Sequence, residues 1–546
     1  MSAVGDAALL LRTEGPSMAR TLAEQVRRRP PPAVRDVVGG LRSVLVTVEP
    51  GTDLVSLAEG LDSLGSVPVE AADPRRHRIP VVFGGPDVPE VCRAAGADPE
   101  TLAELLAGSV LQVAMIGFSP GFAYLQGLPP QLQSVPRRRS PRPEVPAGSL
   151  AVADGFAAVY PQSTPGGWQV VGRTSVRLFD PAVPPYALLR PGDEVCLVPV
   201  TKNVDGTMTD GGGSARRPID PAPGVRPDLI VEVPGLFTLA QDAGRAGLAH
   251  LGVPNAGPAD PLAHALANRL VGNEPGTTAL EITARGPVLR CDSPTPVHVA
   301  VVGGDPEVTV DEHLVGAGHV VPVAPGQRLA VGAPLAGLRT YLALAGGWSL
   351  PSVMGSASTD VLSGMGPGPL VGGDALIRAG DPGPMADRLA PEAWRVLSNG
   401  GTARRTVRVL PGPHPEWFGA GAVEELAGTE WVVQGTSDRV GVRLRPVGGV
   451  GIVRRSGELG SQGMVTGAIQ VPPDGYPVVL GPDHATLGGY PVVAVVVSAD
   501  RWLLGQCRPG DEVVFLPVSP AQASQALASV ARASLAVEGT YPAVVG

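Results

Sequence analysis

The residues best suited to chemistry lie between Asp483 and Tyr490. This stretch brings together a carboxylate, an imidazole and a hydroxyl group, from Asp483, His484 and Thr486. A carboxylate can act as an acid, a base or a metal ligand, and an imidazole can carry protons near neutral pH. Gly488 and Gly489, just before Tyr490, allow a ligand to approach backbone N–H groups closely. The alternative is a plain tight turn, capped by Asp483 and carrying His484 at the surface.

A predicted β-hairpin positions this stretch. Two short apolar runs, Gly467–Val471 and Val478–Leu480, are separated by the turn sequence Pro-Pro-Asp-Gly. Gln470 lies near the end of the first run, where its side chain could hold a substrate amide. Since side chains alternate along a strand, Gln470 could instead point to solvent.

Arginines elsewhere in the chain are candidates for binding an anion. Arg439 and Arg245 each follow an aspartate, Asp438 and Asp242, so each arginine could instead form a structural ion pair with its neighbour. Arg173 is a third candidate with weaker support.

Four further residues are predicted near a ligand. Pro120, Gly121 and Tyr124 belong to a rigid, aromatic-rich loop that could form the wall of a pocket or simply part of the core. Asp260 precedes Pro261, where it would cap a helix that covers a barrel.

The composition indicates a mainly β protein with several domains. The chain has 546 residues with 73 glycines, 60 prolines and 44% hydrophobic residues, and short Val-, Leu- and Ile-rich runs alternate with turn residues. Leu54–Leu64 reads as a helix, and Asp87 and Asp98 are expected to cap two short helices. The expected units are a small α/β domain over 1–75, a β-barrel over 76–200, a linker over 201–227, two barrel-like halves over 228–385 and 386–520, and a helix and tail over 521–546.

A repeated motif indicates that a barrel unit has been duplicated. Arg-Pro-Gly-Asp-Glu-Val occurs at Arg190–Val195 and again at Arg508–Val513, each time near the end of a strand-rich segment.

The sequence argues against several classes of function. A net charge of −9 argues against nucleic acid as a partner, and no apolar run is long enough for a membrane helix. Lys202, the only lysine, lies in neither a phosphate-binding loop nor a biotin attachment sequence. The four cysteines show no metal-ligand spacing, so we predict reduced thiols, no metal site and a cytoplasmic location.

Ordered motifs along nearly the whole chain resemble a known pair of proteins joined end to end. The first half resembles the KipI-like family through Gly117–Leu125, Val145–Ser149, Ser163–Trp168 and Gly172–Thr174. The second half resembles the KipA-like family through Gln241–Gly247, Gly257–Asp260, Ser437–Arg439, Gly467–Pro472 and Asp483–Pro491. The usual Ser-Glu-Gly of the family stands here as Ser461-Gln462-Gly463.

This resemblance implies cyclophilin-like β-barrels and the role of the B and C components of bacterial ATP-dependent 5-oxoprolinase, to which the KipI-like and KipA-like families correspond. Such a component would use ATP, with Mg²⁺, and act with the separate A component of 5-oxoprolinase on 5-oxoproline or a related amide. The same family is similar to the carboxyltransferase region of urea carboxylase, and the KipI name implies an inhibitor of a sensor histidine kinase. These two activities are the alternatives, and the sequence leaves a homo-oligomer open.

Overall fold

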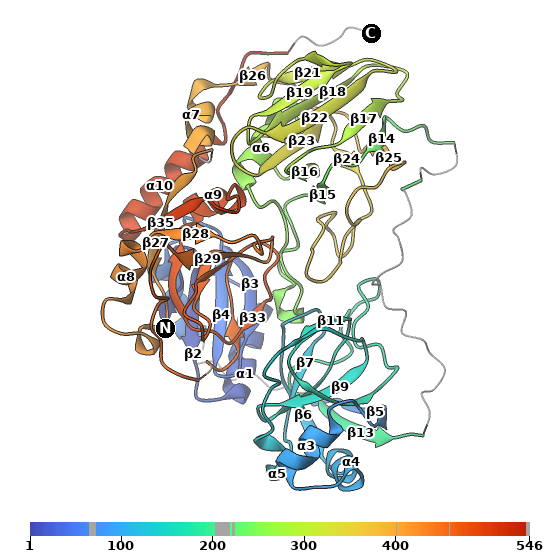
Figure 1. The fold of residues 1–546 in the computed structure, drawn as a ribbon, viewed down its shortest axis with the longest axis vertical. Coiled ribbons are helices and arrows are strands. Elements are labelled where there is room, and N and C mark those ends of the chain that lie inside the picture. The colour runs from blue at the N-terminus through green and yellow to red at the C-terminus, as the bar shows by residue number, and fades with distance from the viewer. Residues whose placement is uncertain (65–72, 202–218, 221–223, 400, 458, 542–546) are drawn as a thin grey trace.

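The computed structural model describes residues 1–64, 73–201, 219–220, 224–399, 401–457 and 459–541. Lys202 and most of the linker predicted at 201–227 lie outside the described residues. The described chain forms four units, which we call the N-terminal unit, the first barrel, the middle unit and the second barrel (Figure 1).

The N-terminal unit is a four-stranded sheet of order β1-β2-β4-β3 with two helices. Ala19, Ala23 and Val26 recur on one side of the first helix and are buried with the apolar residues of the sheet, as the helical period predicts. The predicted helix Leu54–Leu64 is confirmed. The elements are β1 (Ser2–Ala3), β2 (Ala8–Arg12), α1 (Pro16–Arg28), β3 (Val34–Gly39), β4 (Ser43–Val48) and α2 (Leu54–Leu64).

The first barrel is closed by seven strands in the order β10-β7-β6-β13-β5-β12-β9. A separate two-stranded sheet, β8 with β11, lies beside it. The elements are β5 (Arg76–Phe83), α3 (Val88–Ala95), α4 (Pro99–Ala107), β6 (Val110–Ile116), β7 (Ala123–Gln126), α5 (Pro130–Gln133), β8 (Arg142–Val145), β9 (Ser149–Ala153), β10 (Phe156–Val159), β11 (Thr164–Gly166), β12 (Gln169–Arg173) and β13 (Glu194–Pro199).

The middle unit differs from the barrel-like half expected over 228–385. Its strands form two packed sheets, β20-β19-β22-β17-β14-β25-β24 and β15-β16-β23-β18-β21, around one apolar core. Helix α6 covers the outer face of the second sheet and shares a core with the second barrel. The elements are β14 (Leu229–Val233), β15 (Phe237–Gln241), η1 (Ala249–Leu251), α6 (Pro261–Leu270), β16 (Ala279–Thr283), β17 (Val288–Cys291), β18 (Val297–Val302), β19 (Pro306–Val310), β20 (His313–Leu314), β21 (Val320–Val323), β22 (Arg328–Pro334), β23 (Arg339–Leu344), β24 (Trp348–Ser349) and β25 (Ala375–Arg378).

The second barrel is also closed by seven strands, in the order β27-β34-β31-β32-β29-β28-β35. The predicted hairpin is confirmed, since Ile469 in β31 pairs with Val479 in β32. The elements are β26 (Arg388–Leu389), α7 (Pro391–Asn399), β27 (Arg404–Pro411), η2 (Pro415–Trp417), α8 (Ala422–Gly428), β28 (Trp431–Val433), β29 (Gly441–Pro446), β30 (Gln462–Gly463), β31 (Ala468–Gln470), β32 (Val478–Leu480), β33 (Leu487–Gly488), β34 (Val492–Val496), η3 (Ser498–Asp500), α9 (Arg501–Gly505), β35 (Glu512–Pro517), α10 (Pro520–Ala533) and β36 (Val537–Glu538).

The two barrels have the same strand order when each is read from its first strand, which confirms the predicted duplication. In each barrel the first and last strands pair in parallel, with an arginine opposite a glutamate. These pairs are Arg76 with Glu194 and Arg404 with Glu512. Even the small side sheet recurs, as β8 with β11 and as β30 with β33.

The N-terminal unit and the second barrel lie side by side, although they are at opposite ends of the sequence (Figure 1). Leu45 of β4 shares an apolar core with Met464 and Leu487 of the second barrel and with Phe122 of the first barrel. The stretch Asp483–Tyr490 is therefore placed where three units meet.

Candidate functional site: a cavity between three units

A cavity of about 130 Å³ opens where the N-terminal unit, the segment after η1 and the second barrel meet. Two of the three residues predicted to act in catalysis, His484 and Thr486, line it. Its polar lining residues are Arg35, Asp36, Thr47, Asn255, Thr466, His484, Thr486 and Arg501. The cavity fits a small metabolite, since pockets for drug-sized ligands are several times larger.

Arg501 supplies a positive charge to this cavity that no protein group neutralises directly. It is the first residue of α9, and its Nε is buried. Among the described residues its guanidinium has no hydrogen-bond or ion-pair partner. Burial lowers the pKa of Arg501, Asp6 opposes this effect, and Arg35 adds to it. A buried cation is costly unless it is paired, so the cavity favours an anionic ligand.

Thr486 and His484 supply neutral hydrogen-bonding groups. Thr486 is 3% exposed and its hydroxyl has no hydrogen-bond partner among the described residues. Nδ1 of His484 lies 2.8 Å from the carbonyl oxygen of Ala485. A carbonyl only accepts, so Nδ1 carries the proton and Nε2 is left as an acceptor.

His484 does not titrate near neutral pH, contrary to the sequence-based expectation. Burial, reinforced by the nearby Arg501, lowers its pKa to about 4. The neutral imidazole can accept a hydrogen bond, but it is a weak base.

Asp36 fixes the wall of the cavity formed by the segment around η1. Its two carboxylate oxygens accept hydrogen bonds of 3.0 Å from the backbone N–H groups of Gly247 and Ala249. On the other side of this segment, the predicted loop at Pro120 and Gly121 packs against it, since Gly121 N–H donates to the carbonyl of Leu251 at 2.8 Å. The segment is thus held between the N-terminal unit and the first barrel.

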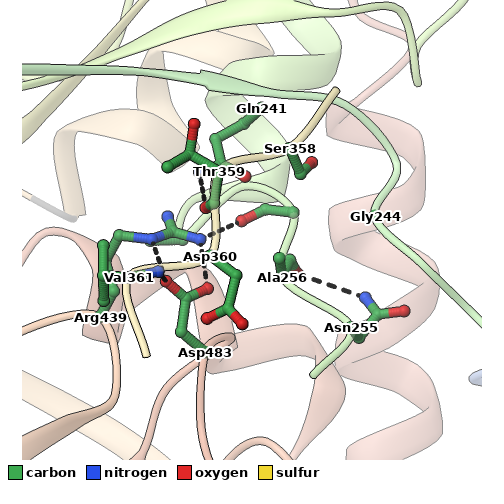
Figure 2. A network of polar contacts seen from close by, with 12 residues as sticks. Gln241, Gly244, Asn255, Ala256, Ser358, Thr359, Asp360, Val361, Arg439 and Asp483 are labelled. Atoms are coloured by element: carbon green, nitrogen blue, oxygen red, sulfur yellow. Dashed lines mark hydrogen bonds and ion pairs between the residues drawn. The ribbon is translucent and has the colours of Figure 1, made fainter. Parts of the chain in front are cut away.

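Asp483 does not line the cavity. It forms a buried ion pair with Arg439 (Figure 2). Nε and one terminal nitrogen of Arg439 donate to the two Asp483 oxygens at 2.9 and 2.7 Å. Asp483 also accepts from the N–H of Val361 at 3.0 Å. The alternative prediction that Arg439 pairs with Asp438 is wrong. Asp438 instead accepts hydrogen bonds from the backbone N–H groups of Val440 and Gly441.

Arg439 joins the second barrel to the middle unit. Its other terminal nitrogen donates to Glu281 at 2.6 Å, and Arg339 lies 3.3 Å from the same carboxylate. Glu281 also accepts from the Tyr341 hydroxyl at 2.7 Å. Burial alone would raise the pKa of Glu281, but Arg439 and Arg339 together lower it to about 2.

Two other buried carboxyl groups near this network have raised pKa values. Burial, with repulsion from Asp483, raises the pKa of Asp360 to about 6. Burial also raises the pKa of Asp260 to about 6, although Asp260 caps α6 as predicted and accepts from Ala263 at 2.9 Å and from Gln506 at 2.7 Å. All of these bonds lie inside the protein, so Asp260 lies away from the cavity.

Arg245 and Asp242 both bind the loop over residues 353–358 and do not pair with each other. Arg245 donates to the carbonyl of Val353 at 2.9 Å and to the carbonyls of Ser356 and Ser358. Asp242 accepts from the same loop, including the N–H of Ala357 at 2.7 Å. The structure therefore places both residues in a brace for that loop.

Four more predicted residues belong to the second barrel but do not line the cavity. Gln470 is buried and donates to the sulfur of Met464 at 3.3 Å, so it does not point to solvent. Gly488 pairs with Gln462 in the side sheet, Gly489 accepts from Leu459, and Tyr490 is half-buried.

Two predicted residues of the first barrel lie outside the cavity. Tyr124 is buried in an aromatic cluster with Phe122 and Trp168. Arg173 is exposed at the end of β12.

Arg35 and Arg501 were missed by the sequence analysis. Arg501 follows the short helix η3 and resembles any surface arginine at a helix start, and Arg35 lies in a strand of another unit. The available signal was the proximity of Arg501 to the strand-rich segment that carries the predicted site. Only the fold shows that these two residues lie near His484.

Two protein-family descriptions match successive parts of the chain. The family described as "Carboxyltransferase domain, subdomain C and D" matches residues 1–189, and "Carboxyltransferase domain, subdomain A and B" matches residues 251–517. The C component of 5-oxoprolinase from Escherichia coli K12 is 35% identical over 298 residues, which cover 54% of this chain and 92% of that protein. The B component of 5-oxoprolinase from Escherichia coli O157:H7 is 37% identical over 211 residues, which cover 37% of this chain and 96% of that protein.

A solved structure, that of TTHA0988, matches almost the entire chain. Its TM-score is 0.79 with 34% sequence identity, and the match covers 93% of this chain and 99% of that chain. Within the residues that the structure describes, none of the helices is long and apolar enough to cross a membrane.

Proposed function

Because this chain belongs to the carboxyltransferase-domain family and joins regions homologous to the B and C components of 5-oxoprolinase, we propose that it is the fused B and C component of an ATP-dependent 5-oxoprolinase. It would act with a separate A component and convert 5-oxoproline, ATP and water to glutamate, ADP and phosphate. The observation that carries the proposal is the unpaired guanidinium of Arg501, with its buried Nε, in a small cavity lined by Thr486 and His484.

The cavity has the chemical groups that 5-oxoproline would need. The substrate is a small lactam with one carboxylate, which Arg501 would bind with support from Arg35. The unpartnered hydroxyl of Thr486 can donate to the lactam carbonyl, and Nε2 of neutral His484 can accept from the lactam N–H. Binding would therefore satisfy groups that the protein leaves unpaired, and burial would strengthen each interaction.

ATP would supply the driving force, because the lactam is too stable to hydrolyse without coupling. Phosphorylation of the amide oxygen would make it a better leaving group. A cavity of about 130 Å³ is too small for a nucleotide, so in this proposal it holds the lactam alone. The residues around it would orient the lactam and exclude water from its faces.

The test is coupled turnover of 5-oxoproline and ATP by the purified chain together with the A component. We expect Arg501→Gln to lower kcat/KM by about a hundredfold or more, because the carboxylate loses its buried cation. Arg443→Gln is the matched control, since Arg443 is exposed on β29 and does not line the cavity, and it should keep full turnover. Wild-type chain that gives no turnover with the A component, or equal loss in both variants, would contradict the proposal.

A second candidate is the carboxyltransferase component of a biotin-dependent enzyme, which the descriptions of both matching families favour. In that case the cavity would hold a urea-type amide, and a separate protein would supply carboxybiotin. Transfer of labelled carboxyl from free carboxybiotin to urea, without ATP-dependent cleavage of 5-oxoproline, would favour this candidate over the first.

A further inference from the structure

A second and larger hollow, of about 670 Å³, lies on the other side of the η1 segment. Helix α1 of the N-terminal unit, the Arg190–Asp193 turn of the first barrel and residues Leu248–Leu251 enclose it. We call it the α1 cleft. Its volume is within the range of pockets that bind drug-sized or nucleotide-sized ligands.

The α1 cleft is rich in arginine. Five arginines and three carboxylates line it, an excess of two positive charges in a chain whose net charge is −9. The arginines are Arg20, Arg27, Arg28, Arg75 and Arg190, and the carboxylates are Glu24, Asp73 and Asp193. A concave surface of one sign concentrates ligands of the opposite charge.

Arg20 is the arginine whose charge is available to a ligand. Glu24 pairs with Arg27 at 3.1 Å and with Arg28 at 2.9 Å, and Asp193 binds Arg75 and Arg190. Arg20, in contrast, has no hydrogen-bond or ion-pair partner among the described residues.

Gly192 allows the Arg20 guanidinium to lie against the turn. A Cβ at this position would lie 2.6 Å from the Arg20 Nη1, and the backbone at Gly192 has a φ of +100°. A side chain here would displace the guanidinium from the cleft. The turn therefore accommodates a cation that forms no ion pair with the described residues.

Two further residues of the α1 cleft have groups free to bind a ligand. Nδ1 of His250 is buried and has no hydrogen-bond partner among the described residues. Tyr186 presents a half-buried ring at the edge of the same cleft, and an aromatic ring can stack on a nucleobase.

We propose that the α1 cleft binds a phosphate-bearing small molecule, with Arg20 as the anchor for the phosphate and Arg190 and His250 beside it. Phosphate fits better than a single carboxylate, because the unpaired Arg20 lies among other arginines in a hollow that is much larger than a small acid requires. This inference does not rest on the proposed function, since it concerns a different hollow and different residues.

The cleft and the cavity share the η1 segment as a wall. Ala249 lines the cavity, whereas Leu248, His250 and Leu251 line the cleft. Only the η1 segment would thus separate a phosphate compound in the cleft from a small acid in the cavity.

The test is isothermal titration calorimetry of the full chain with inorganic phosphate, pyrophosphate and ATP. We expect pyrophosphate to bind and Arg20→Gln to weaken it at least tenfold. Arg29→Gln is the matched control, because Arg29 follows the same helix, is exposed and does not line the cleft, so its binding should equal that of wild type. ATP binding tighter than pyrophosphate would identify a nucleotide as the ligand, and equal binding would identify the phosphate groups alone.

A second variant distinguishes a local effect from misfolding. Gly192→Ala should also weaken pyrophosphate binding, because the new Cβ displaces the Arg20 guanidinium, whereas thermal melting would show whether either variant still folds. The proposal is wrong if wild type binds none of the three compounds at millimolar concentration. It is also wrong if folded Arg20→Gln binds pyrophosphate as tightly as Arg29→Gln.

Discussion

The two barrels share one strand order but use their equivalent charged residues differently. Asp193 in the first barrel binds Arg75, Arg190 and His77, all partly exposed, and the two arginines line the α1 cleft. Asp511 in the second barrel, at the same place in the repeated motif, pairs with the fully buried Arg405. The same aspartate therefore holds partly exposed cations in the first barrel and a fully buried arginine in the second.

The first arginine of each motif shows the same contrast. Arg190 is half exposed, whereas Arg508 donates to the carbonyls of Gly337 and Pro334 in the middle unit. The side-chain oxygen of Gln506 accepts hydrogen bonds from the backbone N–H groups of Leu338 and Arg339. The second copy uses its polar groups to hold the middle unit, whereas in the first copy Arg190 and Asp193 bind each other beside the α1 cleft.

The largest expected effect tests whether the second barrel is held by its buried charges. Arg439→Met would leave Glu281 and Asp483 buried without their cation, and we expect a loss of about 3–5 kcal/mol in unfolding free energy. Chemical denaturation measures it. Arg443→Met, on the exposed face of the neighbouring strand β29, should change stability by less than about 0.5 kcal/mol. Equal effects of the two variants would contradict the assignment of Arg439 as a brace.

A smaller effect tests the contact between the barrels. A Cβ on Gly117 of the first barrel would lie 2.2 Å from Cγ of Leu487 in the second. We expect Gly117→Ala to cost about 1–3 kcal/mol, because the packed leucine must shift. Gly435→Ala is the control, since its Cβ would meet nothing within 4 Å. If both variants melt at the wild-type temperature, the barrels are not packed together as described.

Asp360 and Asp193 should contribute to stability with opposite pH dependence. The pKa of Asp360 is raised to about 6, so the folded state holds its proton more tightly, and wild type loses stability as pH rises from about 4 to 6. Asp360→Asn should therefore gain on the order of 1 kcal/mol over wild type at pH 7 and nothing at pH 4.

Asp193 provides the comparison for this measurement. Burial alone would raise its pKa, but Arg75 and its other partners hold it below the usual range, so its contribution is present at pH 7 and is lost as pH falls through that lowered pKa. Asp193→Asn should thus be destabilised most at pH 7 and least in acid. Parallel pH profiles for the two variants would show that the environments are alike.

The smallest effect on stability comes from two equivalent threonines. Thr164 and Thr486 each lie two residues before a Gly-Gly pair, and each has a buried hydroxyl without a hydrogen-bond partner among the described residues. We expect Thr164→Val and Thr486→Val to change stability by less than about 0.5 kcal/mol, since no bond is lost. Only Thr486→Val should reduce turnover of 5-oxoproline, because only Thr486 lines the cavity.

Local patterns in the sequence were sufficient for much of the fold. The hairpin at Gly467–Leu480 and the helix at Leu54–Leu64 depend on short-range periodicity and turn residues, and the duplication was visible as a repeated motif. The predicted cap at Asp98 is confirmed by a 2.7 Å bond from Thr101. Asp87 is also the N-cap residue of its helix, but its side chain forms no capping bond, because its carboxylate binds Arg138 and Arg142.

The candidate site was harder to predict because it depends on contacts between distant segments. Arg35 and Arg501 are in different units, and no local pattern indicates that they line one cavity. Asp483 and Arg439 were both predicted, yet their mutual ion pair, and hence their place in a buried brace, appears only in the folded chain. Within Asp483–Tyr490, sequence could not tell which side chains face the cavity.

The shared core of the N-terminal unit and the second barrel has a consequence for assembly. In Escherichia coli two proteins, named as the B and C components of 5-oxoprolinase, are similar to different parts of this single chain. Covalent linkage replaces a bimolecular encounter by an intramolecular one, with an effective local concentration on the order of millimolar. The contact should therefore persist at any dilution, and its one-to-one stoichiometry is set by translation.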